Sequence, residues 1–491
     1  MRTALRRLVV VGLLTTGLTA GLLPGRAVGA AATITQLGQA VTVGTHGNEP
    51  IIKVAPDGTM YISALEWLYV STDHGISWKL SPGNLLLNSI SNGGINKNTD
   101  SSIDTDPGGR LYLTFDTPYA GTTTTCYSDD RAQTLTCDPT TLPGGTDRMW
   151  VTAVDNQTSY LTTNEALYDT LFFSSADRGQ SYHVQKHTNS LLNPNDGPLA
   201  RRPATPEMYQ PFVDNATNLT ATTNELSGPL DVHVWDPSSS SPLPSSSLLT
   251  PLMAGAAIND AAFTADGTLY IASEDPNTNS AGTVTGKILQ VIRSTDGGQH
   301  WTKLPPIPGT TTGTAAFAWL AAGSKGHVGV VYYYTAVGGR ADTLQGTWDA
   351  KWAETVNADS ANPTWSITTL DRGVHTGSMC TTAGCLGADR FAGDFLGATF
   401  DPQDHAQVTW MRNKPGSNPV VNEVRYAGVA AAATGAPSAP RTATTSAHDM
   451  LPPTSGGPEP VTGVLLVATG AALAGLVTTR LRSRSPSPPD R

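Results

Sequence analysis

The chain has 491 residues, of which only 14% are charged, and it is rich in Gly (49) and Pro (35). Acidic residues outnumber basic ones by 40 to 30. Once the first 32 and the last 31 residues are set aside, 22 basic and 39 acidic residues remain. The resulting net charge of −17 repels phosphate backbones and excludes nucleic acid as a partner.

Residues 1–32 have the pattern of a secretory signal peptide. Arg2, Arg6 and Arg7 precede an apolar run from Leu8 to Leu23, and small residues follow that run. We therefore expect the protein to be exported. A twin-arginine signal, built on Arg6 and Arg7, is the alternative form of this export signal.

Residues 33–430 have the pattern of an all-β domain. Short alternating runs such as "GTMYISA", "GRLYLTF" and "GTLYIAS" recur between clusters of Gly, Pro, Asn and Asp, and helical periodicity is nearly absent. Candidate unit starts lie at residues 48, 99, 146, 208, 259, 315 and 392, which are 47 to 77 residues apart. We predict a β-propeller of four-stranded blades, with seven blades favoured and six as the alternative.

One octet, Ser-x-Asp-x-Gly-x-x-aromatic, occurs three times in this domain. Its residues are Ser71, Asp73, Gly75 and Trp78, then Ser175, Asp177, Gly179 and Tyr182, then Ser294, Asp296, Gly298 and Trp301. The Ser, Asp and Gly of the octet favour a tight turn, because Asp accepts nearby backbone N–H groups and Gly permits a positive φ. The aromatic residue adds a large apolar surface that can pack against a neighbouring blade.

The octets resemble the Asp-box, or BNR repeat, of the sialidase superfamily, and the resemblance covers nearly all of residues 33–430. The segment "HTGSMCTTAGC…DRFAGDF" is similar to exported bacterial sialidase-like propellers. The resemblance implies that each octet closes the hairpin between the third and fourth strands of a blade, far from the catalytic funnel. Asp73, Asp177 and Asp296 would then be structural.

Acidic residues stand just before the predicted innermost strand in five of the seven units: Glu49, Asp100, Asp147, Asp260 and Asp394. In a propeller these positions surround one mouth of the central channel, where we expect Arg148, His375, Asp389 and Arg390 to join them. Such a ring can hydrogen-bond sugar hydroxyls, or hold a cation such as Ca²⁺ through oxygen ligands. In the alternative interpretation, each acid caps the turn at the start of its own strand.

The resemblance implies an active site with three arginines, an Asp acid/base and a Tyr nucleophile activated by Glu. The early Arg-Ile-Pro-type motif is missing here. Candidate arginines are Arg110, Arg148, Arg293, Arg340, Arg390 and Arg412, and candidate tyrosines are Tyr332, Tyr333 and Tyr334. None lies in a recognisable triad context, so no catalytic residue is assigned. We expect a monomer that binds carbohydrate or protein at the funnel; the alternative is an exo-α-sialidase-like glycoside hydrolase.

The four cysteines suit an exported protein, and we expect the pairs Cys126–Cys137 and Cys380–Cys385. A metal site of His375, Cys380 and Cys385 would lack a fourth ligand, so no metal cofactor is expected. Trp235, Trp348, Trp352 and Trp365 are candidates for a sugar platform or, in the alternative, for packing between blades.

The C-terminal part has the pattern of a surface anchor. Residues 431–460 form a stalk rich in Ala, Pro, Thr and Ser, which ends near "LPPTSG", a segment that resembles the LPxTG signal of sortase substrates. Residues 461–479 are uncharged and long enough to span a membrane, and residues 480–491 form a basic cytoplasmic tail. We expect the protein at the cell surface, held by this helix or attached to the cell wall by sortase.

Overall fold

The computed structural model describes residues 32–83, 100–117, 122–138, 142–143, 148–165, 169–188, 195–213, 228–239, 245–254, 259–380, 389–413 and 421–429. All of them belong to the first of two compact units, residues 1–434 and 435–491. The predicted signal peptide (except Ala32), stalk, "LPPTSG" motif, terminal helix and basic tail lie outside the described residues. No helix that could cross a membrane occurs in the described part of the chain.

The regular structure of the described residues is β-strand throughout, which confirms the all-β prediction. The first strands are β1 (Val41–Gly44), β2 (Pro50–Val54), β3 (Met60–Ala64), β4 (Trp67–Ser71), β5 (Lys79–Leu80), β6 (Ser101–Thr105), β7 (Leu111–Thr117), β8 (Thr122–Ser128), β9 (Thr136–Cys137) and β10 (Leu142–Pro143). They are followed by β11 (Trp150–Ala153), β12 (Ser159–Glu165), β13 (Asp169–Ser175), β14 (His183–His187), β15 (Asn195–Asp196), β16 (Ala200–Arg201), β17 (Met208–Val213), β18 (Gly228–Trp235) and β19 (Ser245–Ala254). The last strands are β20 (Asp260–Phe263), β21 (Leu269–Thr278), β22 (Val284–Ser294), β23 (Thr302–Lys303), β24 (Thr314–Ala322), β25 (Val328–Thr335), β26 (Gly346–Thr355), β27 (Ser366–Gly377), β28 (Gly397–Phe400), β29 (Ala406–Asn413) and β30 (Asn422–Ala427).

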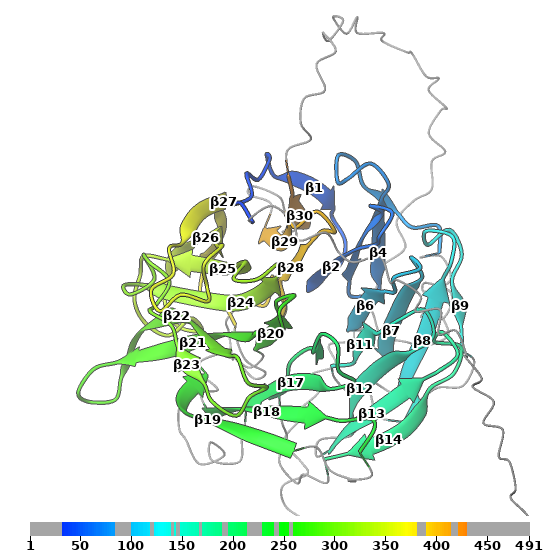
Figure 1. Cartoon of the computed structure of the whole chain (residues 1–491). Coiled ribbons are helices and arrows are strands. Elements are labelled where there is room, and N and C mark those ends of the chain that lie inside the picture. Colours follow the sequence, from blue (N-terminus) through cyan, green and yellow to red (C-terminus); the bar gives the residue numbers. More distant parts are fainter. Residues whose placement is uncertain are drawn as a thin grey trace, which may run out of the picture. The chain divides into compact units, whose positions relative to one another are not determined.

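These strands form a β-propeller, in which antiparallel sheets are arranged radially around a central channel (Figure 1). Successive strands pair in order, as in β2-β3-β4-β5 and β11-β12-β13-β14. One eight-stranded sheet consists of two antiparallel halves, β20–β23 and β24–β27, which a single parallel pair, Lys287 and Thr314, joins. We call each four-stranded group a blade. The strand nearest the axis in each blade is its inner strand.

The inner strands are β2, β6, β11, the split pair β15 and β16, β20, β24 and β28. Neighbouring inner strands contact each other from β28 through β2 and β6 to β11, and from β16 through β20 and β24 back to β28. The sequence analysis placed a unit start at residue 208, but Met208 begins β17, which is the second strand of its blade. The inner strand there is the interrupted segment 195–201, whose short pieces lack the alternating pattern of a strand.

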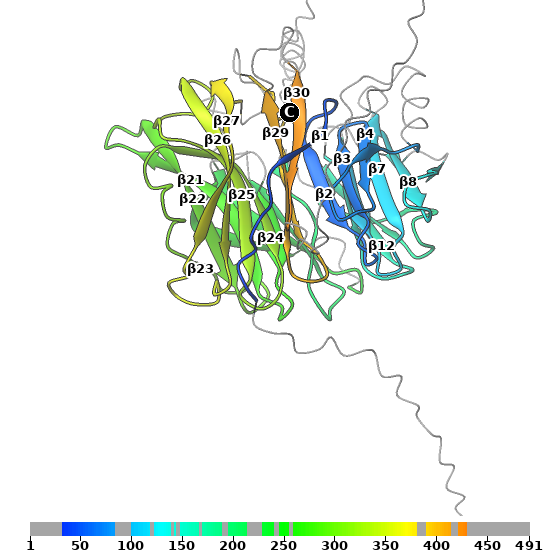
Figure 2. The same ribbon diagram turned by 90° about the horizontal axis from the view of Figure 1, so that it is seen from above.

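The N-terminal strand closes the propeller. β1 pairs antiparallel with β30 and so supplies the outer strand of the blade built from β28, β29 and β30. Figure 2 shows β1 beside β30, although they lie at opposite ends of the described chain. Because the chain continues from β1 into β2 of the first blade, the pairing of β1 with β30 joins the last blade to the first.

Each octet is the turn between the third and fourth strands of its blade. In the first, the hydroxyl of Ser71 donates to Asp73 Oδ1 (2.8 Å) and accepts from the N–H of Gly75 (2.8 Å), while Asp73 Oδ1 also accepts from the N–H of Ser77 (2.9 Å). The same bonds recur at 175–182 and 294–301. The octets therefore act as turn-closing units.

A fourth such turn, at 128–135 between β8 and β9, escaped the sequence analysis. Ser128 and Asp130 make the same bonds, but Ala132 occupies the Gly position and Leu135 the aromatic one. Ala132 adopts the left-handed conformation there (φ 57°). The turn thus tolerates a small residue other than Gly, at a cost in backbone strain.

The interior is packed between the faces of neighbouring blades. Trp235 stacks on Phe172 of the preceding blade with ring centroids 5.0 Å apart, and Trp78 meets Tyr426 edge to face at 5.1 Å. Trp235, Trp348 and Trp352 are fully buried, which is packing rather than an open sugar platform.

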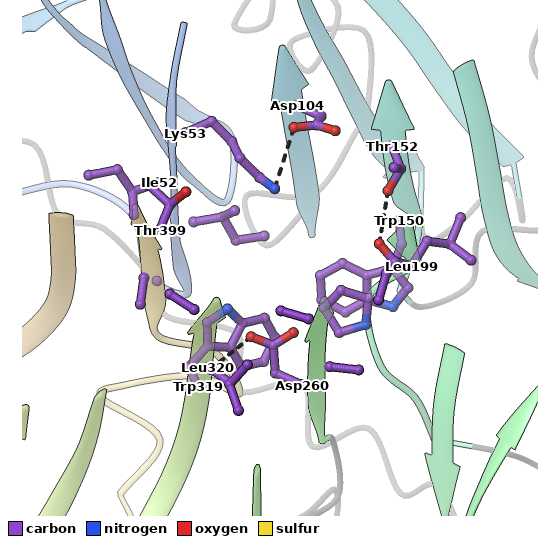
Figure 3. A pocket seen from close by; sticks show the side chains of 18 of the residues that line it. Ile52, Lys53, Asp104, Trp150, Thr152, Leu199, Asp260, Trp319, Leu320 and Thr399 are labelled. Carbon is purple, nitrogen blue, oxygen red and sulfur yellow. Dashed lines mark hydrogen bonds and ion pairs between the residues drawn. The ribbon is translucent and has the colours of Figure 1, made fainter. Parts of the chain in front are cut away.

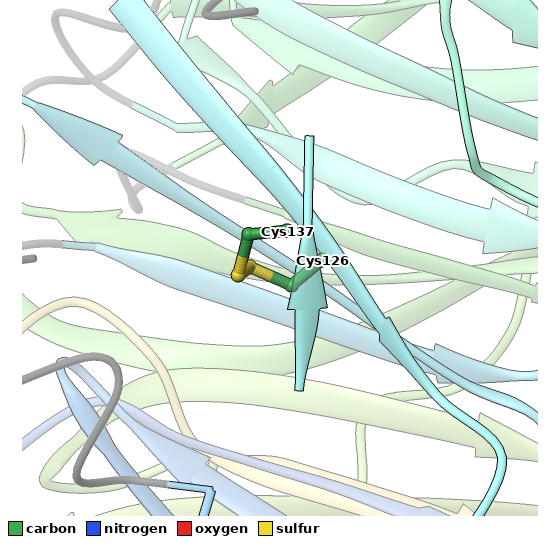
Figure 4. Close-up of a disulfide and its surroundings, with 2 residues drawn as sticks. All are labelled: Cys126 and Cys137. Carbon is green, nitrogen blue, oxygen red and sulfur yellow. A yellow bond between two sulfur atoms is a disulfide. The ribbon is translucent and has the colours of Figure 1, made fainter. Parts of the chain in front are cut away.

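A disulfide joins Cys126 of β8 to Cys137 of β9 (Figure 4). It bridges the two strands beside the fourth octet-like turn, since the two cysteines are paired in register. Cys380 is also disulfide-bonded, but its predicted partner, Cys385, lies outside the described residues.

Candidate functional site

One mouth of the channel carries a cluster of charged side chains from several blades. Glu49 Oε1 accepts a hydrogen bond from the backbone N–H of Asp394 (2.9 Å). The carboxylate of Asp394 binds two guanidinium groups, Arg390 through Oδ1 (2.8 Å) and Arg148 through Oδ2 (3.2 Å). These residues stand just before β2, β11 and β28, so the ends of inner strands bring them together, as the sequence analysis expected.

The environment of Glu49 favours its neutral form. Burial is the largest cause that raises the pKa of this carboxyl group well above its usual range, and the charges of Asp100 and Asp394 raise it further. Arg390 opposes the shift, while a side-chain hydrogen bond with Asp100 adds to it. Glu49, which lies next to the carboxyl group of Asp100, therefore retains a proton more readily than an isolated glutamate. We call Glu49, Asp100, Arg148, Arg390 and Asp394 the mouth cluster.

The backbone of the mouth cluster is held in an uncommon conformation. Glu49 and Arg148, which are not glycines, have positive φ angles of 54° and 57°. Gly393 (φ 66°) is needed for close approach, because a Cβ atom there would lie 2.0 Å from Glu49 Cγ. Backbone strain of this kind gathers at functional sites, where the surrounding structure imposes it.

Asp260 does not join the mouth cluster, which corrects the expected ring. It is the first residue of β20, and its carboxylate accepts a hydrogen bond from the N–H of Leu320 in the next inner strand (2.9 Å). Asp104 does the same for Ala153 (2.8 Å). An inner strand exposes one unpaired edge to the channel, so these carboxylates satisfy edge N–H groups. Asp147 lies outside the described residues.

His375 and Asp389 lie beside the cluster rather than within it. The ring of His375 stacks on Phe391 (4.4 Å between centroids), its Nε2 donates to the carbonyl of Ser378 (3.0 Å) and its Nδ1 lies 3.2 Å from the amide nitrogen of Asn413. Asp389 is 3.9 Å from His375 Nδ1, and about half of its side chain is exposed. This histidine is buried and packed, while Asp389 and Arg390 face solvent.

Three aromatic side chains close the channel beneath the mouth. Trp150 of β11 and Trp319 of β24 come from distant parts of the ring, yet their ring centroids are only 6.0 Å apart. Phe395, just before β28, contacts both, at 5.0 and 5.5 Å. All three are at least 95% buried. They form an aromatic plug that separates the mouth cluster from the rest of the channel.

Beyond the plug, the channel contains a cavity of about 280 Å³ (Figure 3). Every inner strand except β15 contributes to its wall. Its polar groups include Lys53, whose ammonium group lies 3.4 Å from Asp104 Oδ1, together with Thr152, Thr399 and Asp260. Burial raises the pKa of Asp260 to about 7, against the effects of the Leu320 hydrogen bond and of Lys53. The sequence analysis named neither Lys53 nor Asp104. A single charged residue within an alternating strand is usually assigned to the solvent-facing side of the sheet.

The described arginines do not form an open three-arginine clamp. Arg110 pairs with Asp129, Arg340 with Asp342, Arg412 with Asp371, and Arg293 donates to the carbonyls of Ala358 and Ser360. Tyr332 is buried, while Tyr333 and Tyr334 donate their hydroxyls to the carbonyls of Met411 and Thr312. In the described part of the chain, no group of three or more His, Cys, Asp or Glu side chains is arranged to hold a metal ion.

No protein-family model matches the chain, and no curated protein matches it in sequence. Among solved structures, it is similar to the endosialidase of phage phi92 (10% identity over 84% of this chain and 72% of the other, TM-score 0.48). It is also similar to a family PL25 ulvan lyase (11%, 80% and 93%, TM-score 0.40) and to the GH74 xyloglucanase of Xanthomonas campestris (14%, 78% and 55%, TM-score 0.43). Likeness at this level concerns the fold, so function has to be argued from the site.

Proposed function

We propose that this protein is an exported, surface-anchored β-propeller that binds a carbohydrate or protein ligand at its mouth cluster. The observation that carries the proposal is the convergence of Glu49, Arg148 and Asp394 from the starts of three different inner strands. Nothing in the strand pairing alone requires these charges to meet, and each start of a strand could have been capped locally. The strained backbone at Glu49 and Arg148 supports a role beyond capping.

A carbohydrate is the ligand that this chemistry fits best. Arg390 and Asp389, whose side chains are 44% and 49% exposed, offer donors and acceptors at the surface next to the buried part of the cluster. Sugar hydroxyls both donate and accept, so neighbouring guanidinium and carboxylate groups can bind them in pairs. The predicted signal peptide and the predicted C-terminal anchor support a ligand outside the cell, and a monomer suffices for the site. Ca²⁺ is not required, because Arg148 and Arg390 already balance Asp394.

A glycoside hydrolase, exo-α-sialidase-like in the most specific form, is the second candidate. The raised pKa of Glu49 beside Asp100 favours it, because a carboxyl group whose pKa is raised is better suited to act as a general acid. The pairing of Arg110, Arg293, Arg340 and Arg412 with other parts of the protein argues against a sialic acid clamp. Binding therefore remains the first proposal.

The test is glycan-array binding by the full-length protein, with sialosides and neutral glycans, in the presence of calcium and of a chelator. An Asp147→Asn/Asp394→Asn double variant keeps side-chain size while it removes two charges. We expect it to lose glycan binding, whereas Asp342→Asn, which alters an ion pair with Arg340 elsewhere, should bind normally. Unchanged binding by the double variant would leave only the capping interpretation. If the wild type releases sugar from aryl glycosides and Asp100→Asn does not, the result supports the hydrolase instead.

A further inference from the structure

The channel cavity opens on the face opposite to the mouth cluster. In β2 the residues Pro50 to Ile52 are buried, whereas Lys53 and Val54 are partly exposed. The inner strands β6, β11, β20 and β28 show the same change from a buried start to a more exposed end. Because the plug closes the other end, the cavity is a blind pocket that solvent reaches from the ends of the inner strands.

That opening lies on the octet side of the propeller. Val54 pairs with Met60, and Met60 pairs with Ser71, where the first octet begins. Glu49 precedes the opposite end of β2. The pocket therefore shares neither an entrance nor a side chain with the mouth cluster, and its wall consists of described residues.

The pocket holds polar groups that the protein does not use fully. Trp319 lines it, and the indole N–H of Trp319 has no hydrogen-bond partner among the described residues, although the side chain is 95% buried. Lys53 forms an ion pair with one carboxylate, that of Asp104, and its side chain is 36% exposed, so its ammonium group can donate further hydrogen bonds to a ligand. Asp260 uses Oδ2 for Leu320. Donors and acceptors thus face one another across the cavity (Figure 3).

The remaining wall is apolar and partly flat. The indoles of Trp150 and Trp319 form its closed end, and Ile52, Leu199 and Ala398 lie along its sides. The volume of about 280 Å³ is at the small end of the range for small-molecule sites, about 300–1,000 Å³. The wall carries two basic residues, Lys53 and Arg201, and two acidic ones, Asp104 and Asp260, so the pocket does not favour an ion of either sign. These properties suit a small neutral molecule with several hydroxyl groups and an apolar face.

We propose that this blind pocket binds a single neutral sugar ring, with its hydroxyls bonded to Lys53, Asp104, Asp260 and the Trp319 indole N–H and one face against the indoles. The proposal does not depend on the proposed function of the mouth cluster. It gives the propeller two separate binding sites, one on each face.

The experiment is a titration of the full-length protein with glucose, galactose, mannose and N-acetylglucosamine, followed by ligand-observed NMR, which needs no tryptophan signal. Trp319→Phe removes the free N–H and keeps an aromatic ring. Lys53→Met/Asp104→Asn removes the ion pair, while the Asn oxygen can still accept from Ala153. We expect each variant to bind the preferred sugar about 2- to 10-fold more weakly, the usual effect of a lost hydrogen bond.

The matched control is Asp342→Asn, which lies outside both the pocket and the mouth cluster and should leave this binding unchanged. Thermal unfolding is compared for all variants, and Thr399→Val, another change in the wall, replaces any variant that fails to fold. The proposal is overturned if none of the four sugars binds, if the pocket variants bind like the wild type, or if Asp342→Asn weakens binding equally.

Discussion

Glu49 and Asp394, which are 345 positions apart in the sequence, are joined by a hydrogen bond of 2.9 Å from the Asp394 N–H to Glu49 Oε1. The bond connects the start of β2 to the segment that leads into β28, so it ties the first inner strand to the last. The pairing of β1 with β30 closes the outer edge of the same blade. The first and last parts of the propeller are thus joined in two places, by β1 and β30 at the outer edge and by Glu49 and Asp394 near the axis. The second of these lies in the mouth cluster.

The first prediction concerns Gly393, which permits this closure. Gly393→Ala should destabilise the protein by about 2–4 kcal/mol, because a Cβ atom would clash with Glu49 and the residue has a positive φ. Gly109→Ala is the matched control, since Gly109 has a positive φ of 87° but no atom within 4 Å of the added Cβ. Urea unfolding measures both. Equal losses in the two variants would mean that the contact with Glu49 is unimportant.

The second prediction concerns the octet turns. Asp296→Ala should lower the free energy of unfolding by about 0.5–2 kcal/mol, by analogy with the loss of a helix cap, because the carboxylate accepts the N–H groups of Gln299 and His300. Glycan and sugar binding should not change, since this turn lies away from the mouth cluster. The matching Asp130→Ala change should have a similar effect if the turn at 128–135 is equivalent. A variant with wild-type stability but no ligand binding would contradict the structural role.

The octets show what could be predicted from the sequence and what could not. Three copies were recognisable because each has Ser, Asp, Gly and an aromatic residue at the same spacing. The fourth was missed because Ala132 takes the left-handed conformation that Gly normally supplies and Leu135 replaces the aromatic ring. Hydrogen bonds define the turn, and Ser128 and Asp130 alone are too common a pair to identify it.

The third prediction is a pH dependence of stability through His327. Burial opposes its charge, but hydrogen bonds to Asp404 (2.9 Å) and Glu354 (2.8 Å) outweigh burial and raise the pKa to about 9. A raised pKa means that the stabilisation is complete below the ordinary value of 6.5 and is lost as the pH rises through about 9. His327→Gln should therefore be less stable than the wild type below pH 6.5, and the difference should shrink toward pH 9.

Urea unfolding at several pH values in this window measures that difference. Exposed His183→Gln is the control, and we expect it to match the wild type throughout. Thr35 also donates its N–H and hydroxyl to Glu354, so loss of the histidine should weaken the attachment of the N-terminal segment. A difference that stays constant with pH would rule out a charged His327.

The fourth prediction concerns the disulfide between β8 and β9. Cys126→Ser/Cys137→Ser should reduce the free energy of unfolding by about 2–3 kcal/mol, the loop-entropy value for a bridge that spans 11 positions. Reduction of the wild type should lower the unfolding temperature in the same direction. Peptide mapping without reduction would show whether Cys380 pairs with Cys385. A double Ser variant with full stability would mean that the strand pairing alone holds this edge.

The mouth cluster was only partly predictable for a geometric reason. Residues before an inner strand converge, so Glu49, Asp100 and Asp394 could be grouped from their positions. Asp260 looked equivalent, but it is the first residue of β20 rather than a residue before it. That one step places its carboxylate within the channel wall, against Leu320. Trp150, Trp319 and Phe395 could not be recognised as a plug, because only the closed ring brings β11, β24 and β28 to one axis.

The last prediction separates a functional Glu49 from a structural one. Glu49→Gln keeps an oxygen that can accept the Asp394 N–H and adds an N–H that can donate to Asp100. Burial raises the pKa of Glu49, so a negative charge on this residue destabilises the folded state. This destabilisation grows as the pH rises above the ordinary glutamate range. The neutral amide avoids this cost. We expect Glu49→Gln to be more stable than the wild type at neutral pH, and the gain to vanish in acid.

The same variant should lose glycan binding, or hydrolysis if the protein is an enzyme. Its amide cannot exchange a proton with Asp100 or carry a negative charge, as the carboxyl group of Glu49 can. Such a gain in stability with a loss of function is typical of a site that burial has strained. Glu207→Gln is the control: its partly exposed ion pair with Arg202 should contribute at most about 1 kcal/mol, and its loss should not affect binding. If Glu49→Gln binds normally, the carboxyl group only caps a strand. If Glu49→Gln is less stable than the wild type at neutral pH, Arg148 and Arg390 require a negative charge on Glu49. The interpretation that Glu49 shares a proton with Asp100 would then be wrong.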